Sequence, residues 1–290
     1  MTNLLKYSIA FSLLIGSSHA APPSAGNLLQ DVQKQFDRAK VTPAKPSGLD
    51  IKAEAPTKKV PVGVKILVTS FQFSGNTLIK SEELEKILTK YINLRLTFSE
   101  LQNVARDISN YYQAKGFMAR TFLPPQEVEH GEIEIMILEG NLSGLEIDVT
   151  NLKNFDTKKA QAIIETAHPI GEKLQTKKLE RGLLLLGDIP GIVSSGSLIS
   201  GDKAGDSKLK LKIEDSSRYD IYTNYSNTGS KSTGSDQLTV SAIINSPLSM
   251  GERFSVQGML TKGIRYINGG FSIPLNASGL KVGLSASAMV

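Results

Sequence analysis

The sequence contains no cysteine and no tryptophan, and it has only three histidines in 290 residues. Without cysteine the chain cannot form a disulfide framework, a zinc–thiolate site, an iron–sulfur cluster or a thiol nucleophile. Three histidines are too few for a His-rich metal cluster, and His19 falls in a predicted leader. No Gly-rich phosphate loop follows a strand, and no nucleophile elbow is present. We therefore predict a protein that is not an enzyme and that has no catalytic residues, cofactor or metal.

The net charge of +5 is small, and it is not concentrated on one folded segment. A nucleic-acid-binding protein would gather Lys and Arg on a folded module. Residues 64–215, which carry the clearest fold patterns, instead contain slightly more acidic than basic side chains. We therefore predict that the protein has no nucleic-acid partner.

The chain begins with the pattern of a secretory signal peptide. A short cationic start that ends at Lys6 precedes an apolar run over residues 7–15, and small residues follow at Ser18 and Ala20. This run is far shorter than the ~20 residues of a membrane-spanning helix. We predict a signal peptide over residues 1–20 and export of the mature chain; the alternative is a buried N-terminal helix.

Residues 21–63 combine an amphipathic helix with a linker. A helix over residues 27–40 would place on one stripe Leu28, Leu29, Val32, Phe36 and Ala39. Prolines then interrupt any core-forming pattern between residues 41 and 61. A helix on such a tether is typical of a plug, a lid or a partner-binding element, although a helix packed on the next domain fits the pattern equally well.

Residues 64–215 contain two copies of one strand–helix–helix–strand–strand order. For the first copy, residues 64–141, the patterns predict strands over 66–73, 117–123 and 132–139, with helices that begin at Ser81 and at Thr97 or Ser99. For the second copy, residues 142–215, they predict strands over 145–149, 192–199 and 209–213, with helices over 157–166 and 175–186. We expect the run Leu183–Leu186 to be buried, because four exposed leucines would favour aggregation.

Two long motifs mark these copies. The first is YQAKGFMARTFLPPQ, which starts at Tyr112 and is followed by Gly131 and by Glu139-Gly140. The second is LERGLLLLGDIPG, which starts at Leu179. They resemble the first and second periplasmic POTRA modules of two-partner secretion transporters, the haemolysin/haemagglutinin secretion-activation family. The resemblance implies an α+β fold with two POTRA modules of β-α-α-β-β order.

Parts of these motifs have a direct physical reading. Gly116 supplies a left-handed stop that lets the chain reverse from helix into strand, and Gly191 closes a turn at a position that tolerates positive φ. The two prolines after Leu123 end a strand because they lack backbone donors. His130 and His168 fall in predicted turns, so we expect solvated side chains rather than a base or a metal ligand.

From residue 216 onward the pattern is that of β-strands with few charges. Five runs alternate apolar and polar residues, and each is close to the ~9–11 residues of a tilted membrane strand. They lie near residues 219–225, 237–244, 253–260, 267–273 and 280–286. We predict the first five or so antiparallel strands of a transmembrane β-barrel over residues 216–290; a soluble β-sandwich is the alternative.

Residues 224–252 also resemble the first barrel hairpin of the same family, with departures at Asn224 and Ser226. The resemblance implies a closed barrel, which about five strands cannot form. An open edge in lipid would leave backbone groups unpaired. We therefore expect the chain to be a fragment of a longer product or the product of a truncated gene.

The resemblance implies an outer-membrane transporter of two-partner (type V) secretion in a bacterial cell. Its periplasmic POTRA modules would bind an unfolded exoprotein of the haemolysin or adhesin class and pass it to a barrel embedded in outer-membrane lipid. The alternatives are an assembly factor that receives barrel precursors, a porin or adhesin anchor in which the modules are spacers, and a non-functional truncated transporter. Two modules and the tethered helix favour the transporter.

A free sheet edge is the predicted docking site for the exoprotein. In a strand–helix–helix–strand–strand module, the strand at 117–123 is expected to lie at the edge, where an extended client can add itself as another strand. The predicted contact residues are Ala119, Arg120, Thr121 and Phe122. The alternative is that Arg120 pairs with a nearby acid and that clients bind a helix groove.

Overall fold

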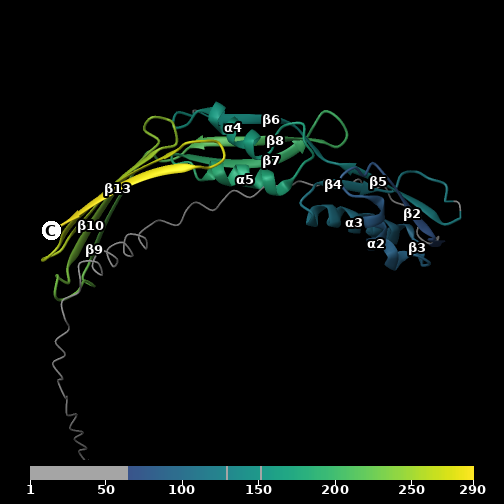
Figure 1. Cartoon of the computed structure of the whole chain (residues 1–290), viewed down its shortest axis with the longest axis horizontal. Coiled ribbons are helices and arrows are strands. Elements are labelled where there is room, and N and C mark those ends of the chain that lie inside the picture. The colour runs from purple at the N-terminus through teal and green to yellow at the C-terminus, as the bar shows by residue number, and fades with distance from the viewer. Residues whose placement is uncertain (1–64, 129, 151) are drawn as a thin grey trace, which may run out of the picture. The chain divides into compact units, whose positions relative to one another are not determined.

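The computed structural model describes residues 65–128, 130–150 and 152–290, and Figure 1 shows their helices and strands. Two helix-and-sheet modules precede a five-stranded antiparallel sheet, as the sequence predicts. The predicted signal peptide (1–20) and the plug-like helix with Leu28, Leu29, Val32 and Phe36 lie outside the described residues, so they stay predictions. None of the helices in the described ranges is long and apolar enough to cross a membrane.

The first module packs two helices against a three-stranded sheet. The helices are α2 (Ser81–Leu88) and α3 (Phe98–Ala114). The sheet has the order β2-β5-β4, with β2 at Ser70–Ser74, β5 at Glu132–Glu139 and β4 at Ala119–Phe122. Strand β5 runs parallel to β2 and antiparallel to β4. A single 3-10 turn, η1 (Thr89–Tyr91), follows α2.

The single strand predicted over residues 66–73 is wrong, because the chain changes pairing partner in its middle. Residues Lys65–Leu67 form β1, which pairs with the unpredicted strand β3 (Arg95–Thr97). The backbone of Val68 then bonds to Asn93 and Leu94, and the N–H of Thr69 donates to Gly131 O at 2.9 Å. The break at residues 68–69 therefore lets one segment join two different sheets.

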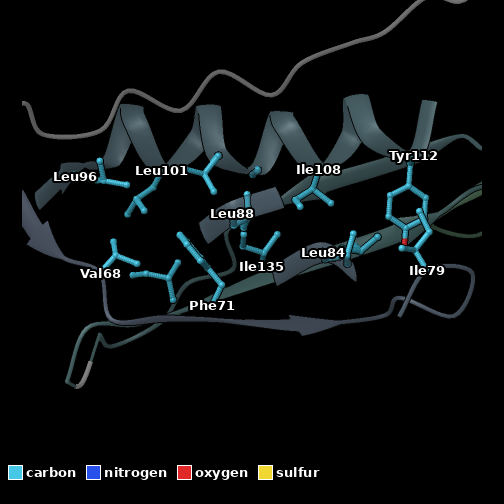
Figure 2. Close-up of a cluster of buried hydrophobic side chains, with 14 residues drawn as sticks. Val68, Phe71, Ile79, Leu84, Leu88, Leu96, Leu101, Ile108, Tyr112 and Ile135 are labelled. Carbon is cyan, nitrogen blue, oxygen red and sulfur yellow. The ribbon is translucent and has the colours of Figure 1, made fainter. Parts of the chain in front are cut away.

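Helix α3 begins and ends where its local signals place it. Thr97 is the N-cap, and a capping box links its side chain and backbone to Glu100. The helix is followed by Gly116 at φ +87°, the left-handed conformation predicted for the reversal. Figure 2 shows Leu101, Ile108 and Tyr112 pointing from this helix into the buried cluster that also holds Phe71 and Ile135.

The second module repeats the same order with longer strands. Its elements are β6 (Asn141–Thr150), α4 (Thr157–Ala167), α5 (Thr176–Gly187), β7 (Ile192–Ser200) and β8 (Asp206–Asp215). The sheet has the order β6-β8-β7, with β8 parallel to β6 and antiparallel to β7. Gly191 has the positive φ predicted for it, at +86°.

Two expectations for the second module are wrong. Leu183 and Leu186 are buried, but Leu184 is 53% exposed and Leu185 is half-buried, since an α-helix of 3.6 residues per turn cannot turn four consecutive side chains to one face. His168 is not solvated, because it is fully buried at the end of α4. Its Nε2 accepts the N–H of Gln175 at 2.9 Å, and its Nδ1 lies 3.0 Å from Pro169 O, so both ring nitrogens have backbone partners.

Five antiparallel strands follow in chain order, each paired with its sequence neighbours. They are β9 (Tyr219–Ser226), β10 (Gln237–Asn245), β11 (Arg253–Leu260), β12 (Arg265–Pro274) and β13 (Lys281–Met289). This up-and-down order confirms the prediction of five consecutive strands, and Figure 1 shows them as the green to yellow segment.

The contrast between neighbouring leucines of α5 gives a stability prediction. Leu183→Ala should lower the free energy of unfolding by about 2–5 kcal/mol, because a cavity opens in a small core. Leu184→Ala should change it by no more than about 0.5 kcal/mol, since that side chain is largely exposed. Urea titration of the full chain in detergent, followed by circular dichroism, measures both; equal losses would contradict the assignment of faces.

Candidate functional site

Strand β4 lies at an open edge of the first module's sheet. Its residues pair with β5 in the register Ala119↔Glu139, Arg120↔Leu138, Thr121↔Ile137 and Phe122↔Met136. Within the described ranges, no strand pairs with the opposite side of β4. The sequence-based prediction that this segment is an edge strand is therefore confirmed. Its use as a docking site is a separate question.

The hydrogen bonds at the start of β4 show which backbone groups are free. The N–H of Gly140 donates to Met118 O at 2.8 Å, so residue 118 faces β5. Backbone groups of alternate residues in a strand point to the same side, hence Arg120 and Phe122 also face β5. The N–H and C=O groups of Ala119 and Thr121 consequently point away from the sheet, where an added strand would meet them.

The side chains of β4 alternate between the two faces of the sheet. Ala119 and Thr121 are half-buried, and the Thr121 hydroxyl donates to Ala105 O and lies 2.7 Å from the Ser109 hydroxyl, both on α3. Arg120 and Phe122 are exposed on the opposite face. The alternative in which Arg120 pairs with a nearby acid finds no support, because Arg120 has no ion pair within the described residues.

A buried carboxylate ties the end of β5 to the rest of the module. The side chain of Glu139 is 1% exposed. It accepts hydrogen bonds from the N–H groups of Thr77 and Leu78, both at 2.7 Å, from the Thr77 hydroxyl and from the Tyr112 hydroxyl at 3.0 Å. Since Glu139 is the β5 partner of Ala119, these bonds fix the strand against which the open edge is built.

The second module supplies one more partner to this carboxylate. Lys173, in the loop between α4 and α5, places its Nζ 3.2 Å from Glu139 Oε2. Backbone bonds surround this ion pair: Met118 N–H donates to Leu174 O at 3.1 Å, Leu174 N–H to Gly140 O at 2.8 Å, and Thr176 N–H to Gly116 O at 3.1 Å. The α4–α5 loop is therefore joined to the strand ends of the first module.

The electrostatics of Glu139 favour its charged form. Burial by itself would raise the pKa of the Glu139 carboxyl, but the hydrogen bonds from Thr77, Leu78 and Lys173 outweigh it and hold the pKa below its ordinary value. Burial, together with the neighbouring Glu139 charge, raises the pKa of the Tyr112 hydroxyl, which stays protonated as a donor.

Sequence reasoning missed the role of Glu139 and Lys173. Glu139-Gly140 belongs to the motif that carries the resemblance. In this strictly alternating strand, Glu139 is an acid on the face that otherwise carries Ile133, Ile135 and Ile137. An acid on the buried face of a strand needs donors, so that position was a usable signal. Nothing in the local pattern indicates that the partner is Lys173.

The five-stranded sheet separates apolar from polar residues across its register. One face carries rows that run across all five strands, for example Tyr219, Ile244, Phe254, Phe271 and Leu284. The opposite face carries polar rows, for example Tyr222, Ser241, Gln257, Asn268 and Ser287. An apolar face opposite a mainly polar one is the arrangement of a transmembrane barrel wall.

A polar cluster joins this sheet to the second module, and sequence reasoning missed it too. The buried Asn154 donates its side-chain amide to Gly191 O at 3.0 Å and Ser216 O at 3.1 Å. The hydroxyl of Ser246, in the β10–β11 turn, donates to Asn154 O. Glu252, also fully buried, closes the same turn by accepting the N–H groups of Leu248 and Met250.

Two known families match the segments that form these features. Residues 66–140 match the family described as POTRA domain, ShlB-type. Residues 205–289 match the haemolysin secretion/activation protein family ShlB/FhaC/HecB. Over these two segments the chain is similar to this family of two-partner secretion transporters. Members of the family lie in the bacterial outer membrane with their POTRA modules in the periplasm, and so does this chain.

Individual relatives of this chain are also named as transporters. The heme/hemopexin transporter protein HuxB of Haemophilus influenzae is 29% identical over 258 residues, which are 87% of this chain and 45% of HuxB. The outer membrane transporter CdiB of Dickeya dadantii is 23% identical over 188 residues, 64% of this chain and 32% of that protein. This chain therefore spans less than half the length of these relatives.

Solved structures share the fold. CdiB from Escherichia coli matches with a TM-score of 0.58 and 22% identity, over 87% of this chain and 46% of that chain. CdiB from Acinetobacter baumannii matches with a TM-score of 0.57 and 16% identity, over 91% of this chain and 52% of that chain. At these identities the likeness concerns the arrangement of helices and strands.

The lowered pKa of Glu139 gives a pH prediction. A carboxyl whose pKa is lower in the folded state contributes stability that is present above its unfolded-state pKa of 4.5 and is lost as pH falls through the folded-state pKa. Glu139→Gln should therefore lower the free energy of unfolding at pH 7 by about 1–3 kcal/mol and flatten its decline below pH 4.5.

Urea titrations of the full chain at several pH values measure both effects. The control is Glu127→Gln, at an exposed acid of the same module. If Glu139→Gln and the control have the same pH profile as the unmodified chain, the carboxylate does not anchor β5.

Proposed function

We propose that this chain is part of an outer-membrane transporter of two-partner secretion whose periplasmic modules bind an unfolded exoprotein and pass it to the barrel. The relatives HuxB and CdiB are named as transporters, and residues 205–289 match a family of haemolysin secretion and activation proteins. The apolar face of the five-stranded sheet would contact outer-membrane lipid. The proposed role involves binding and transfer only, with no catalysed reaction.

The open edge of β4 is the observation that carries this proposal. Ala119 and Thr121 present unpaired backbone donors and acceptors, and an extended polypeptide can satisfy them by forming one more strand. Such binding depends on the backbone more than on side chains. It therefore suits a transporter that must handle one segment of a long client after another.

Removing one outward-facing donor tests the role of the edge. Thr121→Pro deletes the N–H that points away from β5, and it should weaken client binding by at least about threefold, the value of one lost hydrogen bond. The probe is the urea-unfolded secretion domain of the cognate exoprotein, titrated into the full chain in detergent and followed by fluorescence anisotropy.

Thr121→Val is the matched control, because it loses the same hydroxyl bonds to α3 but keeps the backbone donor. We expect it to bind the client as the unmodified chain does. Equal affinities for all three proteins, with unchanged circular dichroism, would rule out β4 as the docking strand.

A further inference from the structure

We propose that the β4 edge prefers client segments in which an acidic residue lies two positions from an apolar one. This inference rests on the proposed docking of a client strand at β4 and adds the side-chain chemistry of the segment that docks. It concerns the face of the sheet that carries Arg120 and Phe122, opposite to the face covered by the helices.

The register places two different environments next to each other on that face. Arg120 lies opposite Leu138, and Phe122 lies opposite Met136. Phe122 is 40% exposed, while Met136 and Leu138 are half-buried. A client side chain beside Phe122 would therefore contact an apolar strip, whereas one beside Arg120 would meet a guanidinium group.

Arg120 is the sole cation that the described strands place on this face. The other charged residues there are Glu132 and Glu134 on β5, and both already accept hydrogen bonds from β2. Glu132 accepts from Ser70 at 3.3 Å and from Gln72 at 3.2 Å, and Glu134 accepts from Ser74 at 2.8 Å. These acids lie toward the Phe122 end of β4, since Phe122 pairs with Met136 and Arg120 with Leu138.

The edge thus has a positive charge near Arg120 and negative charges toward its Phe122 end. Arg120 has no ion pair within the described ranges, so its charge is available to a partner. A client acid is attracted at the Arg120 position and repelled toward the Glu134 end. A client base has the opposite preference. The edge therefore distinguishes one register of a charged client segment from the others.

Strand geometry then sets the spacing of the client side chains. Side chains at positions i and i+2 of a strand lie on the same face, and directly opposite cross-strand pairs approach to about 4.5–5.5 Å between Cβ atoms. One client strand can consequently place an acid beside Arg120 and an apolar side chain beside Phe122 only if these are two residues apart. On the helix side the client would meet Ala119 and Thr121, which carry no charge.

A charge-swap experiment tests this preference on the full chain in detergent. The probes are two fluorescent eight-residue peptides of alternating valine and threonine, in which one valine is replaced by aspartate or by lysine. The unmodified chain should bind the aspartate peptide about two- to fivefold more tightly than the lysine peptide, as expected for an exposed cross-strand ion pair. Arg120→Glu should invert the preference, and Arg120→Gln should remove the preference for aspartate.

The controls separate this inference from the proposed function. Thr121→Pro should weaken the binding of both peptides by the same factor, because it removes a backbone hydrogen bond that both peptides would make. Suppose that Thr121→Pro weakens the binding of both peptides but Arg120→Glu leaves the ratio of their two affinities unchanged. The edge then docks clients without this selectivity, so the inference is wrong while the proposed function stands. If Thr121→Pro changes neither affinity, docking at β4 fails as well.

A second copy of the chain is the competing occupant of this edge. Sedimentation of the unmodified chain without peptide should show a monomer at the concentrations used for binding. A dimer that Thr121→Pro dissociates would mean that β4 pairs with another copy, and it would overturn the assignment to a client segment. Circular dichroism of Arg120→Glu and Arg120→Gln confirms that the exposed substitutions leave the fold intact.

Discussion

The carboxylate of Glu139 is the constraint on which the open edge of β4 depends. It is buried at the last position of β5, and an isolated charge there would be strongly destabilising. Thr77, Leu78 and Tyr112 satisfy it from within the first module, and Lys173 does so from the second. The carboxylate therefore joins the sheet, the helix layer and the next module at one point. Strand β5, which pairs with β4, is anchored by this same carboxylate.

The two ends of the second module are joined to their neighbours by polar contacts with different chemistry. At one end, an ion pair and a short run of strand-like backbone bonds connect the α4–α5 loop to Gly116, Met118 and Gly140. At the other end, Asn154 and Ser246 exchange neutral hydrogen bonds with turn backbone. Both junctions bury polar groups that need every partner, since an unmade buried hydrogen bond costs free energy.

The sequence was sufficient for much of the architecture. The alternation of residues 132–139 fixed β5 at its observed bounds, and Thr97, Gly116 and Gly191 behaved as the cap, the stop and the turn that local chemistry requires. Errors arose where pairing or packing partners were distant. The strand at 66–73 divides because its halves join different sheets. Leu184 faces away from the core, and His168 is buried, with a hydrogen bond from the backbone of Gln175.

The sequence by itself determined the module order, the edge position of β4 and the five alternating strands, because each depends on short periodic patterns and on residues with restricted backbone conformations. Only the tertiary structure decided that Ala119 and Thr121 present the free backbone groups, that Arg120 has no ion pair in the described ranges, and that Glu139 meets Lys173. These features depend on register and on contacts between residues far apart in the chain. A shift of one residue in the pairing of β4 with β5 would exchange the free and the bonded groups, and local pattern does not encode that register.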